Sequence, residues 1–331
     1  MKVAALGLAA AGALALAVNA PIATTVLGLV LFGVLHNVLE LRYVAGRFAS
    51  VLSGRFLVLL VALVSGIVVC RVAALVVGAP ARYAEIVIGY AVLAAAAVVA
   101  RGTIRHVVLA AVAVATVAST MWPAYHFVVL AHLHNLVPLV FLWEWSRQLP
   151  TKTAFRAVQI GWVLVVPALV LAGAVDPWTG DLTATAFVDD PARVVAASAP
   201  PSTLDSVMGV RFLVVFAFLQ TMHYVVWVWF LPRYAPDAAE AFERRVPALT
   251  GPRVWALGVG GGALLAVLFA MDYWGGRSVY AAFATYHAYL EFPVLLALLL
   301  GSTGGRNTNE AFSANGASAA VRRGRPDRTA A

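Results

Sequence analysis

Five histidines of this 331-residue chain lie inside long apolar stretches, where ionisable side chains are rare. They are His36, His132, His134, His223 and His287. Ionisable groups within a membrane span usually face the interior of a helix bundle, because lipid cannot solvate them, so each indicates a functional site. Imidazole nitrogens are good ligands for iron, zinc and copper. These five histidines are therefore the candidate ligands of a metal ion.

Two of the histidines are followed by a glutamate four residues later. His36 and Glu40 stand in HNVLE, and His287 and Glu291 stand in HAYLE. Residues four apart share one face of a helix, so each pair presents an imidazole and a carboxylate together. We expect these glutamates to act as ligands or as proton acceptors. Glu291, nearer to mid-depth of its span, is the expected ligand, and Glu40 the expected proton acceptor or outer partner.

The spacing of His132 and His134 separates their roles. The side chains of two residues that are two positions apart on a helix point about 200° apart, so they cannot both face one point. We expect one of them at the metal site and the other with a different partner. A ligand histidine usually needs a hydrogen-bond acceptor on its other nitrogen, and Asn135 and Gln220 are candidates for that position.

The composition predicts an all-α, polytopic transmembrane bundle. The chain is 62% hydrophobic and only 11% charged, and its apolar runs have the length of about 20 residues that crosses a hydrocarbon core. Residues 1–301 form this bundle, and no soluble domain is expected. The ten predicted spans are 3–19, 22–41, 54–78, 83–100, 104–121, 124–146, 156–175, 207–231, 252–272 and 279–300.

Basic residues gather in alternate loops, as in Arg42–Arg47, Arg147–Lys152 and Arg244–Arg245. By the positive-inside rule these loops are cytoplasmic, which puts both termini of a ten-span chain inside. The net charge of +8 therefore reflects topology and contact with membrane lipid, not nucleic acid. Residues 302–331, rich in Gly, Ser, Ala, Asn and Arg, are predicted to be a disordered basic cytoplasmic tail.

The first 20 residues fit two interpretations. A basic start, an apolar stretch and small residues near the end are typical of a signal peptide. They are equally typical of a first span, and almost no polar spacer separates them from the next one. We expect the segment to be retained, in the inner membrane of a bacterial cell, with cleavage as the alternative.

Three further features bear on the bundle. Arg71 lies inside a predicted span and needs an anionic or carbonyl partner, most simply a structural one. Glu85 stands near a span end and is expected in interface water. The run GVGGG at 258–262 permits close helix packing. The single cysteine, Cys70, leaves no paired-cysteine metal motif.

The candidate ligands lie at similar depths. At 1.5 Å per residue, His36, His223, His287 and the 132–134 pair fall within about 10 Å of the middle of their spans. The spans 22–41, 124–146, 207–231 and 279–300 are therefore expected to converge on one site.

The expected arrangement, in which several helices supply histidines to one buried site, resembles that of the Brp/Blh carotenoid-cleaving dioxygenases. These are membrane proteins that hold iron through histidines. The resemblance rests on His36 with Glu40, His132 with His134, His223 and His287, and covers only these positions. The His-Gly-x-x-Asp-His stretch of that family is absent, and HNVLEL stands in a roughly comparable place. The resemblance implies iron and a lipid-soluble substrate, without identifying that substrate.

The expected function is that of a membrane-embedded, metal-dependent oxidoreductase or oxygenase. Its cofactor would be iron, with zinc or copper as alternatives, and its substrate a hydrophobic small molecule. A haem-binding electron-transfer protein with histidine axial ligands is the first alternative. A proton- or metal-coupled transporter is the second, and a purely structural role for the histidines is the third.

Overall fold

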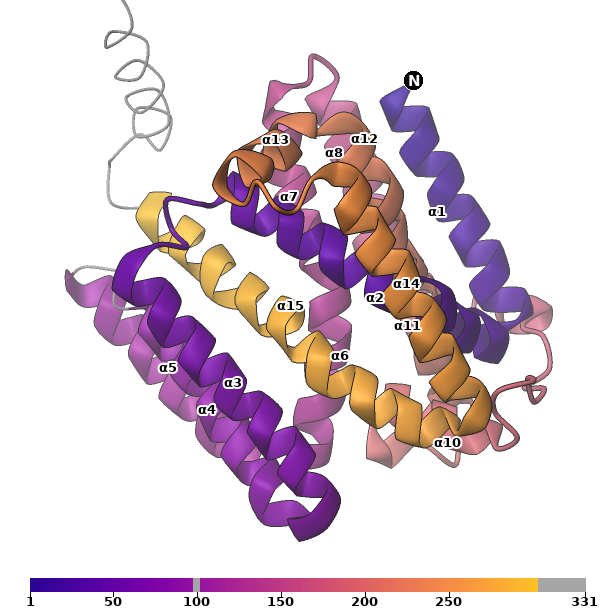
Figure 1. Ribbon diagram of the computed structural model, residues 1–331. Coiled ribbons are helices and arrows are strands. Elements are labelled where there is room, and N and C mark those ends of the chain that lie inside the picture. Colours follow the sequence, from indigo (N-terminus) through magenta and orange to yellow (C-terminus); the bar gives the residue numbers. More distant parts are fainter. Residues whose placement is uncertain (98–101, 303–331) are drawn as a thin grey trace, which may run out of the picture.

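The computed structural model describes residues 1–97 and 102–302, and within these ranges every regular element is a helix or a helical turn (Figure 1). The α-helices are α1 (Lys2–Asn19), α2 (Pro21–Arg47), α3 (Gly54–Val77), α4 (Ala79–Ala97), α5 (Gly102–Met121), α6 (Pro123–Leu136), α7 (Pro138–Trp145), α8 (Lys152–Ile160), α9 (Val166–Leu171), α10 (Pro191–Ser198), α11 (Val207–Tyr224), α12 (Leu231–Tyr234), α13 (Pro236–Arg245), α14 (Gly251–Met271) and α15 (Tyr273–Ser302). The 3₁₀ turns are η1 (Ser146–Gln148), η3 (Asp176–Trp178) and η4 (Pro201–Thr203), and the π-helical turns are η2 (Gly161–Val165) and η5 (Val225–Phe230).

Eight helical segments of the described chain are long and apolar enough to cross a membrane, so the chain is an integral membrane protein. They are Lys2–Asn19, Pro21–Arg47, Gly54–Val77, Thr103–Met121, Pro123–Gln148, Lys152–Leu171, Val207–Tyr234 and Gly251–Met271. The two other expected spans, 83–100 and 279–300, overlap α4 and α15, which are helical but not among the eight. The count of ten and the side of the termini stay predictions. The predicted tail lies outside the described residues from position 303 onward.

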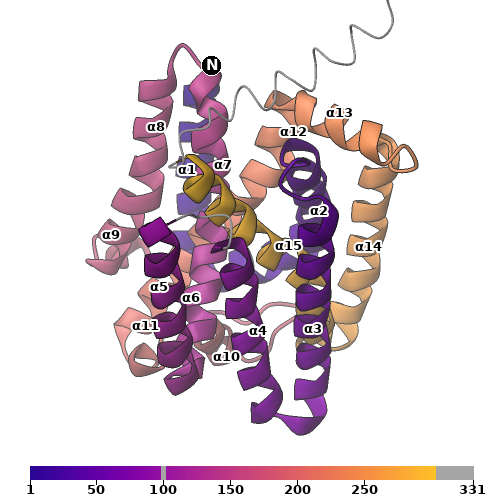
Figure 2. The ribbon, with the colours of Figure 1, turned by 90° about the vertical axis from the view of Figure 1, so that its left-hand side faces the viewer.

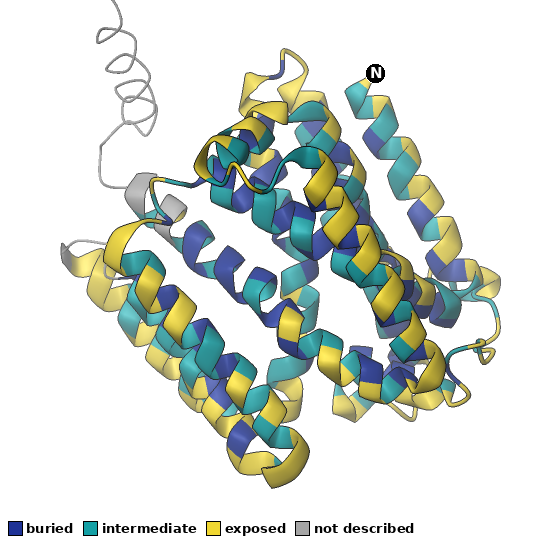
Figure 3. Ribbon diagram, viewed as in Figure 1, coloured by how far each residue is buried: buried dark blue, intermediate teal, exposed yellow. Residues whose placement is uncertain are grey.

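Helix α15 crosses the middle of the molecule in both views (Figures 1 and 2). It packs against α3 and α4 on one side and against α2 and α14 on the other. Much of α15 is buried, whereas α14 exposes a large part of its surface (Figure 3). An apolar outer surface and a polar, buried centre are the pattern expected of a bundle that faces lipid.

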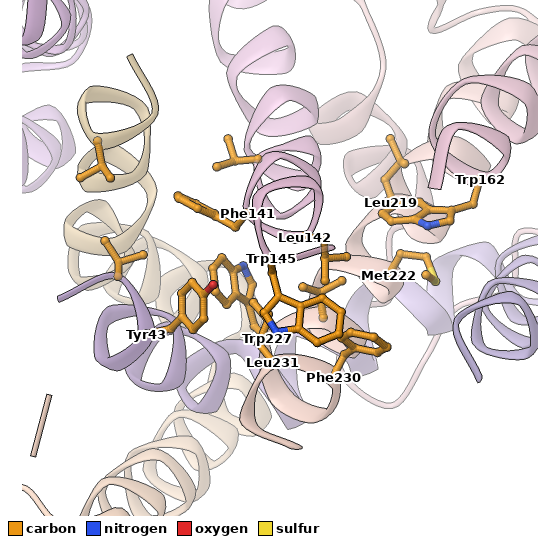
Figure 4. Packing of buried hydrophobic residues seen from close by; sticks show 14 of the residues in the cluster. Tyr43, Phe141, Leu142, Trp145, Trp162, Leu219, Met222, Trp227, Phe230 and Leu231 are labelled. Carbon is orange, nitrogen blue, oxygen red and sulfur yellow. The ribbon is translucent and has the colours of Figure 1, made fainter. Parts of the chain in front are cut away.

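An aromatic cluster (Figure 4) is formed by residues that follow three of the histidines by one to two helical turns in the sequence. Tyr43 of α2, Phe141 of α7 and Trp227 of η5 have ring centres 5.5 to 6.3 Å apart. These positions follow His36, His134 and His223 in the sequence by seven, seven and four residues. Because Phe141 and Trp227 are almost fully buried, the cluster closes this end of the bundle centre.

Glycines bring α14 against the helix that carries His36. A Cβ at Gly258 would lie 2.6 Å from Cδ1 of Leu35, and one at Gly261 would lie 2.9 Å from Cγ1 of Val34. The close packing expected from the run at 258–262 is therefore confirmed. On the same helix α2, Gly46 touches the backbone of Ala238 in α13, so α2 is held by two neighbours.

Candidate metal centre

Four of the five histidines meet at one point inside the bundle. His36 comes from α2, His134 from α6, His223 from α11 and His287 from α15. One ring nitrogen of each lies within 4.8 Å of the corresponding nitrogen of the other three. The predicted convergence of spans 22–41, 124–146, 207–231 and 279–300 is confirmed, and the resulting group can hold a metal ion.

The four imidazoles form a closed ring of neighbours. The ring centres of His36 and His223 are 5.0 Å apart, and those of His36 and His287 are 4.9 Å apart. His134 completes the ring, at 4.5 Å from His223 and 4.8 Å from His287. Each histidine thus borders two others, so all four surround a common centre.

The nitrogen spacing fits ligands of a single ion. Nε2 of His134 lies 3.1 Å from Nε2 of His287. Two nitrogens each about 2.1 Å from one ion lie roughly 3 Å apart when their bonds meet near a right angle, and roughly 4.2 Å apart when they lie opposite. The 4.8 Å limit on the whole group is close to this range.

Two of the histidines are oriented by hydrogen bonds on the side away from the centre. Nδ1 of His36 lies 2.8 Å from the backbone oxygen of Phe32, one turn earlier on α2. Nδ1 of His134 lies 2.8 Å from Oε2 of Glu291. Both oxygens are acceptors, so each Nδ1 carries its proton and each Nε2 keeps a free lone pair for a ligand bond.

The other two histidines leave ring nitrogens without partners. Both ring nitrogens of His223 and Nδ1 of His287 are buried and form no hydrogen bond with the described residues. His223 is 1% exposed and His287 is 2% exposed. An unsatisfied polar atom in such an environment is costly, and a bound cation at the centre would satisfy the nitrogens that face it.

The two glutamates cross over between the helices. Glu291 accepts a hydrogen bond from His134 of α6, and not from His287, which lies one turn earlier on the same helix. Oε2 of Glu40 lies 3.6 Å from Nε2 of His223 in α11. Neither glutamate belongs to the close group of ligand atoms. The Glu291 carboxylate contacts the outer nitrogen of a histidine, so in this arrangement it orients a ligand, and its expected role as a ligand itself stays a prediction.

Glu40 and Glu291 are both buried beside the histidines. Glu40 is 1% exposed and Glu291 is 0% exposed. Oε2 of Glu40 and Oε1 of Glu291 have no hydrogen-bond partner among the described residues. Both carboxyl groups are therefore candidates to give or take a proton beside the metal centre.

His132 lies outside the four-histidine group. Its Nε2 is 2.8 Å from the backbone oxygen of Ser198 in α10, and its ring packs on Phe212 and Phe216. The sequence indicated His132 as one of the candidate ligands. In the structure, however, His132 points towards α10 and α11, and His134 faces the centre. One histidine of this pair at the site and one elsewhere is what their spacing predicts.

The expected amide partners of the histidines take other roles. The Gln220 amide donates to the hydroxyl of Tyr224, 2.7 Å away. Nδ2 of Asn135 is buried without a partner among the described residues. The acceptors are instead a carboxylate from α15 and a backbone oxygen of α2. A backbone acceptor one turn away leaves no signal in the sequence, whereas Glu291 stood out in the sequence but not as the partner of His134.

A cavity of about 270 Å³ opens directly onto the histidines, and all four line it. Arg71 also reaches this cavity, where its guanidinium bonds Oε1 of Glu85 at 2.8 Å and the backbone oxygen of Ala281 at 2.5 Å. The structural partner expected for Arg71 is therefore present. The expectation that Glu85 lies in interface water is wrong, because its residue surface is only 3% exposed.

Some residues of the cavity carried no functional signal in the sequence. Tyr280 and Thr25 line it, and so does Arg277, which stands near the start of α15 and reads as a loop charge. Their position depends on how α15 crosses the bundle, which periodicity does not reveal. Comparison of the chain with protein-family models, with curated proteins and with solved structures finds no match.

Proposed function

We propose that this protein is a membrane-embedded, metal-dependent oxidoreductase or oxygenase that acts on a lipid-soluble substrate. The observation that carries the proposal is the group of four histidines whose ligand nitrogens lie within 4.8 Å of one another at the end of a cavity. We place the protein in the inner membrane of a bacterial cell, on the strength of its alternating basic loops.

Iron is the metal that we propose. Nitrogen ligands suit iron, zinc and copper alike, and the resemblance of the histidine placement to Brp/Blh dioxygenases favours iron. Four ligands leave positions of a six-coordinate ion free, and iron bound in this way supplies the capacity to react with dioxygen. A bare ion is favoured over haem, because the macrocycle leaves only two axial positions for histidine whereas four imidazoles surround this centre.

Different residues of the chain would have different roles at this site. His36 and His134 present Nε2 towards the centre, because their Nδ1 protons are bound by the Phe32 backbone and by Glu291. Oε2 of Glu40 lies 3.6 Å from Nε2 of His223, so Glu40 is placed to give or take a proton during a reaction. The buried aromatic residues Phe141 and Trp227 would help to keep water from one end of the site.

The proposal is tested on protein purified in a mild detergent. Elemental analysis should find iron in the wild-type protein and little in His223→Ala, and the visible spectrum should lack the strong Soret band of haem. With lipid extracted from the cells that produce it, the iron-loaded protein should consume oxygen, with His223→Ala as the blank. Equal metal content in both proteins, or no oxygen uptake by the iron-loaded wild type, would count against the proposal.

A further inference from the structure

The cavity above the histidines ends at the beginning of α15. Tyr273, Trp274 and Arg277 line this far end, and the histidines line the other. Helix α10 borders the same end through Val194 and Ser198. The cavity is thus an elongated space between a metal-ligand group and an arginine.

Arg277 differs from Arg71 and Arg211, two other partly buried arginines of the bundle. Arg71 pairs with Glu85, and Arg211 pairs with Asp176. Among the ion pairs of the described residues, none includes Arg277. A partly buried guanidinium in a largely apolar cavity is costly without an anion, so Arg277 is suited to receive the anion from a ligand.

A second guanidinium lies near the first. The Arg193 guanidinium carbon is 4.1 Å from the centre of the Trp274 ring, and that of Arg277 is 5.5 Å from the same centre. Two cations on one ring repel each other unless an anion lies nearby. Arginine binds carboxylate and phosphate groups with two parallel hydrogen bonds, so this end of the cavity has the chemistry of an anion site.

The wall between the two ends is largely apolar, with small residues along one side. Ala281, Ala284 and Ala288 follow Arg277 at intervals of three or four residues, and therefore lie on one face of α15. Phe127, Leu130 and Phe216 line the cavity from other helices. Ten residues separate Arg277 from His287, a rise of about 15 Å along a helix. A flexible hydrocarbon chain fits this path.

A second cavity gives further room. It measures about 280 Å³ and is lined mainly by apolar and aromatic residues of α4, α5, α6 and α15. Leu130 and Tyr289 line both cavities, so the two spaces adjoin. Displacement of these two side chains would open the second cavity to a chain longer than the distance from Arg277 to the histidines.

From this arrangement we propose that the cavity binds a long-chain amphiphile with an anionic head group. The carboxylate or phosphate head lies at Arg277, with Arg193 on the same tryptophan as a second positive charge, and the hydrocarbon chain runs along the small residues of α15 to the four histidines. The fate of the chain at the histidines rests on the proposed function. The binding itself needs only the arginines and the apolar wall.

The test compares ligands that share a tail or a head. Binding to detergent-purified full-length protein is measured for palmitate, hexadecyl phosphate, hexadecanol, acetate and inorganic phosphate. Palmitate or hexadecyl phosphate should bind at least about tenfold more tightly than hexadecanol, since a hydrogen bond to a charged group is among the stronger ones. The tighter of the two identifies the head group. Equal binding of hexadecanol, or comparable binding of acetate or inorganic phosphate, would overturn the proposal.

Variants assign the head group to its site. Arg277→Gln should weaken the preferred anionic ligand by about tenfold or more and leave hexadecanol unchanged, while Arg277→Lys should retain part of the preference. Arg253→Gln is the matched control, because Arg253 is exposed near the start of α14, away from the cavity. An unchanged affinity in a monodisperse Arg277→Gln protein would contradict the assignment.

A metal-free sample separates this inference from the proposed function. Wild-type protein treated with a chelator should keep its preference for the anionic amphiphile over hexadecanol. Binding by a wild-type protein that holds no metal before this treatment would refute the metalloenzyme and leave the amphiphile site standing. Bound metal in a protein that shows no preference for anionic amphiphiles would refute the amphiphile site and leave the metalloenzyme standing.

Discussion

Glu291 accepts a hydrogen bond from Nδ1 of His134, 2.8 Å away, although the two residues are 157 positions apart in the chain. The contact joins α15 to α6 across the centre of the bundle. It fixes which nitrogen of His134 carries the proton and so directs Nε2 towards the other histidines. The carboxylate thus orients a candidate ligand instead of binding at the centre itself.

This relationship predicts a graded effect of Glu291→Gln. The glutamine keeps the size of the side chain and still offers an oxygen to Nδ1, but it removes the charge. We expect the metal to remain detectable while its affinity falls by about 10- to 100-fold, the usual effect of altering an outer partner. Competition with a chelator measures the change, and Glu240→Gln, on exposed α13, is the control. Complete loss of metal would instead identify Glu291 as a ligand.

The packing of α14 on α2 predicts different outcomes for one substitution at two glycines. A Cβ at Gly258 would come within 3.2 Å of the Leu35 Cα and 2.6 Å of its Cδ1, whereas Gly260 has nothing within 4 Å. Gly258→Ala should therefore lower stability by about 1–3 kcal/mol, as overpacking usually does. Gly260→Ala should leave it unchanged or raise it.

Thermal unfolding of the two glycine variants in the same detergent makes this comparison. Because Leu35 directly precedes His36, Gly258→Ala should also reduce metal content in the purified protein. Equal melting temperatures would show that the close contact between α14 and α2 does not form.

The topology remains a prediction that reporter fusions can decide. Ten spans with both termini inside place Gly180 outside and Gly305 inside, because the intervening basic loops alternate. Fusions after these two positions should report opposite sides of the membrane. A signal from the same side would require an even number of crossings between them instead of the predicted three, and the ten-span arrangement would fail.

Much of the site was predictable because few physical explanations exist for an imidazole inside an apolar span. His36, His223 and His287 stood out by residue type alone, and the spacing of His132 and His134 required that only one of them face the centre. Helical periodicity placed each glutamate on the face of its histidine. These inferences use only local geometry, which a helix determines almost completely.

The contacts between helices were harder to predict from the sequence. Glu291 and Glu40 each serve a histidine of another helix, and nothing within a single span indicates that exchange. Glu85 seemed to lie at a span end, but Arg71 of the neighbouring helix draws it into a buried ion pair. Arg277 resembled a loop charge until the path of α15 put it at the end of the cavity. Each case depends on which helices are neighbours.

The central claim is that the four histidines form a metal site, and one pair of variants tests it most directly. His132 and His134 lie on the same helix two residues apart, but only His134 belongs to the close group of ligand nitrogens. Metal content is measured by elemental analysis of wild-type protein, His132→Ala and His134→Ala purified in parallel. The structure predicts about one ion per chain in the first two proteins and little metal in His134→Ala. Equal metal content in the two variants would contradict the site.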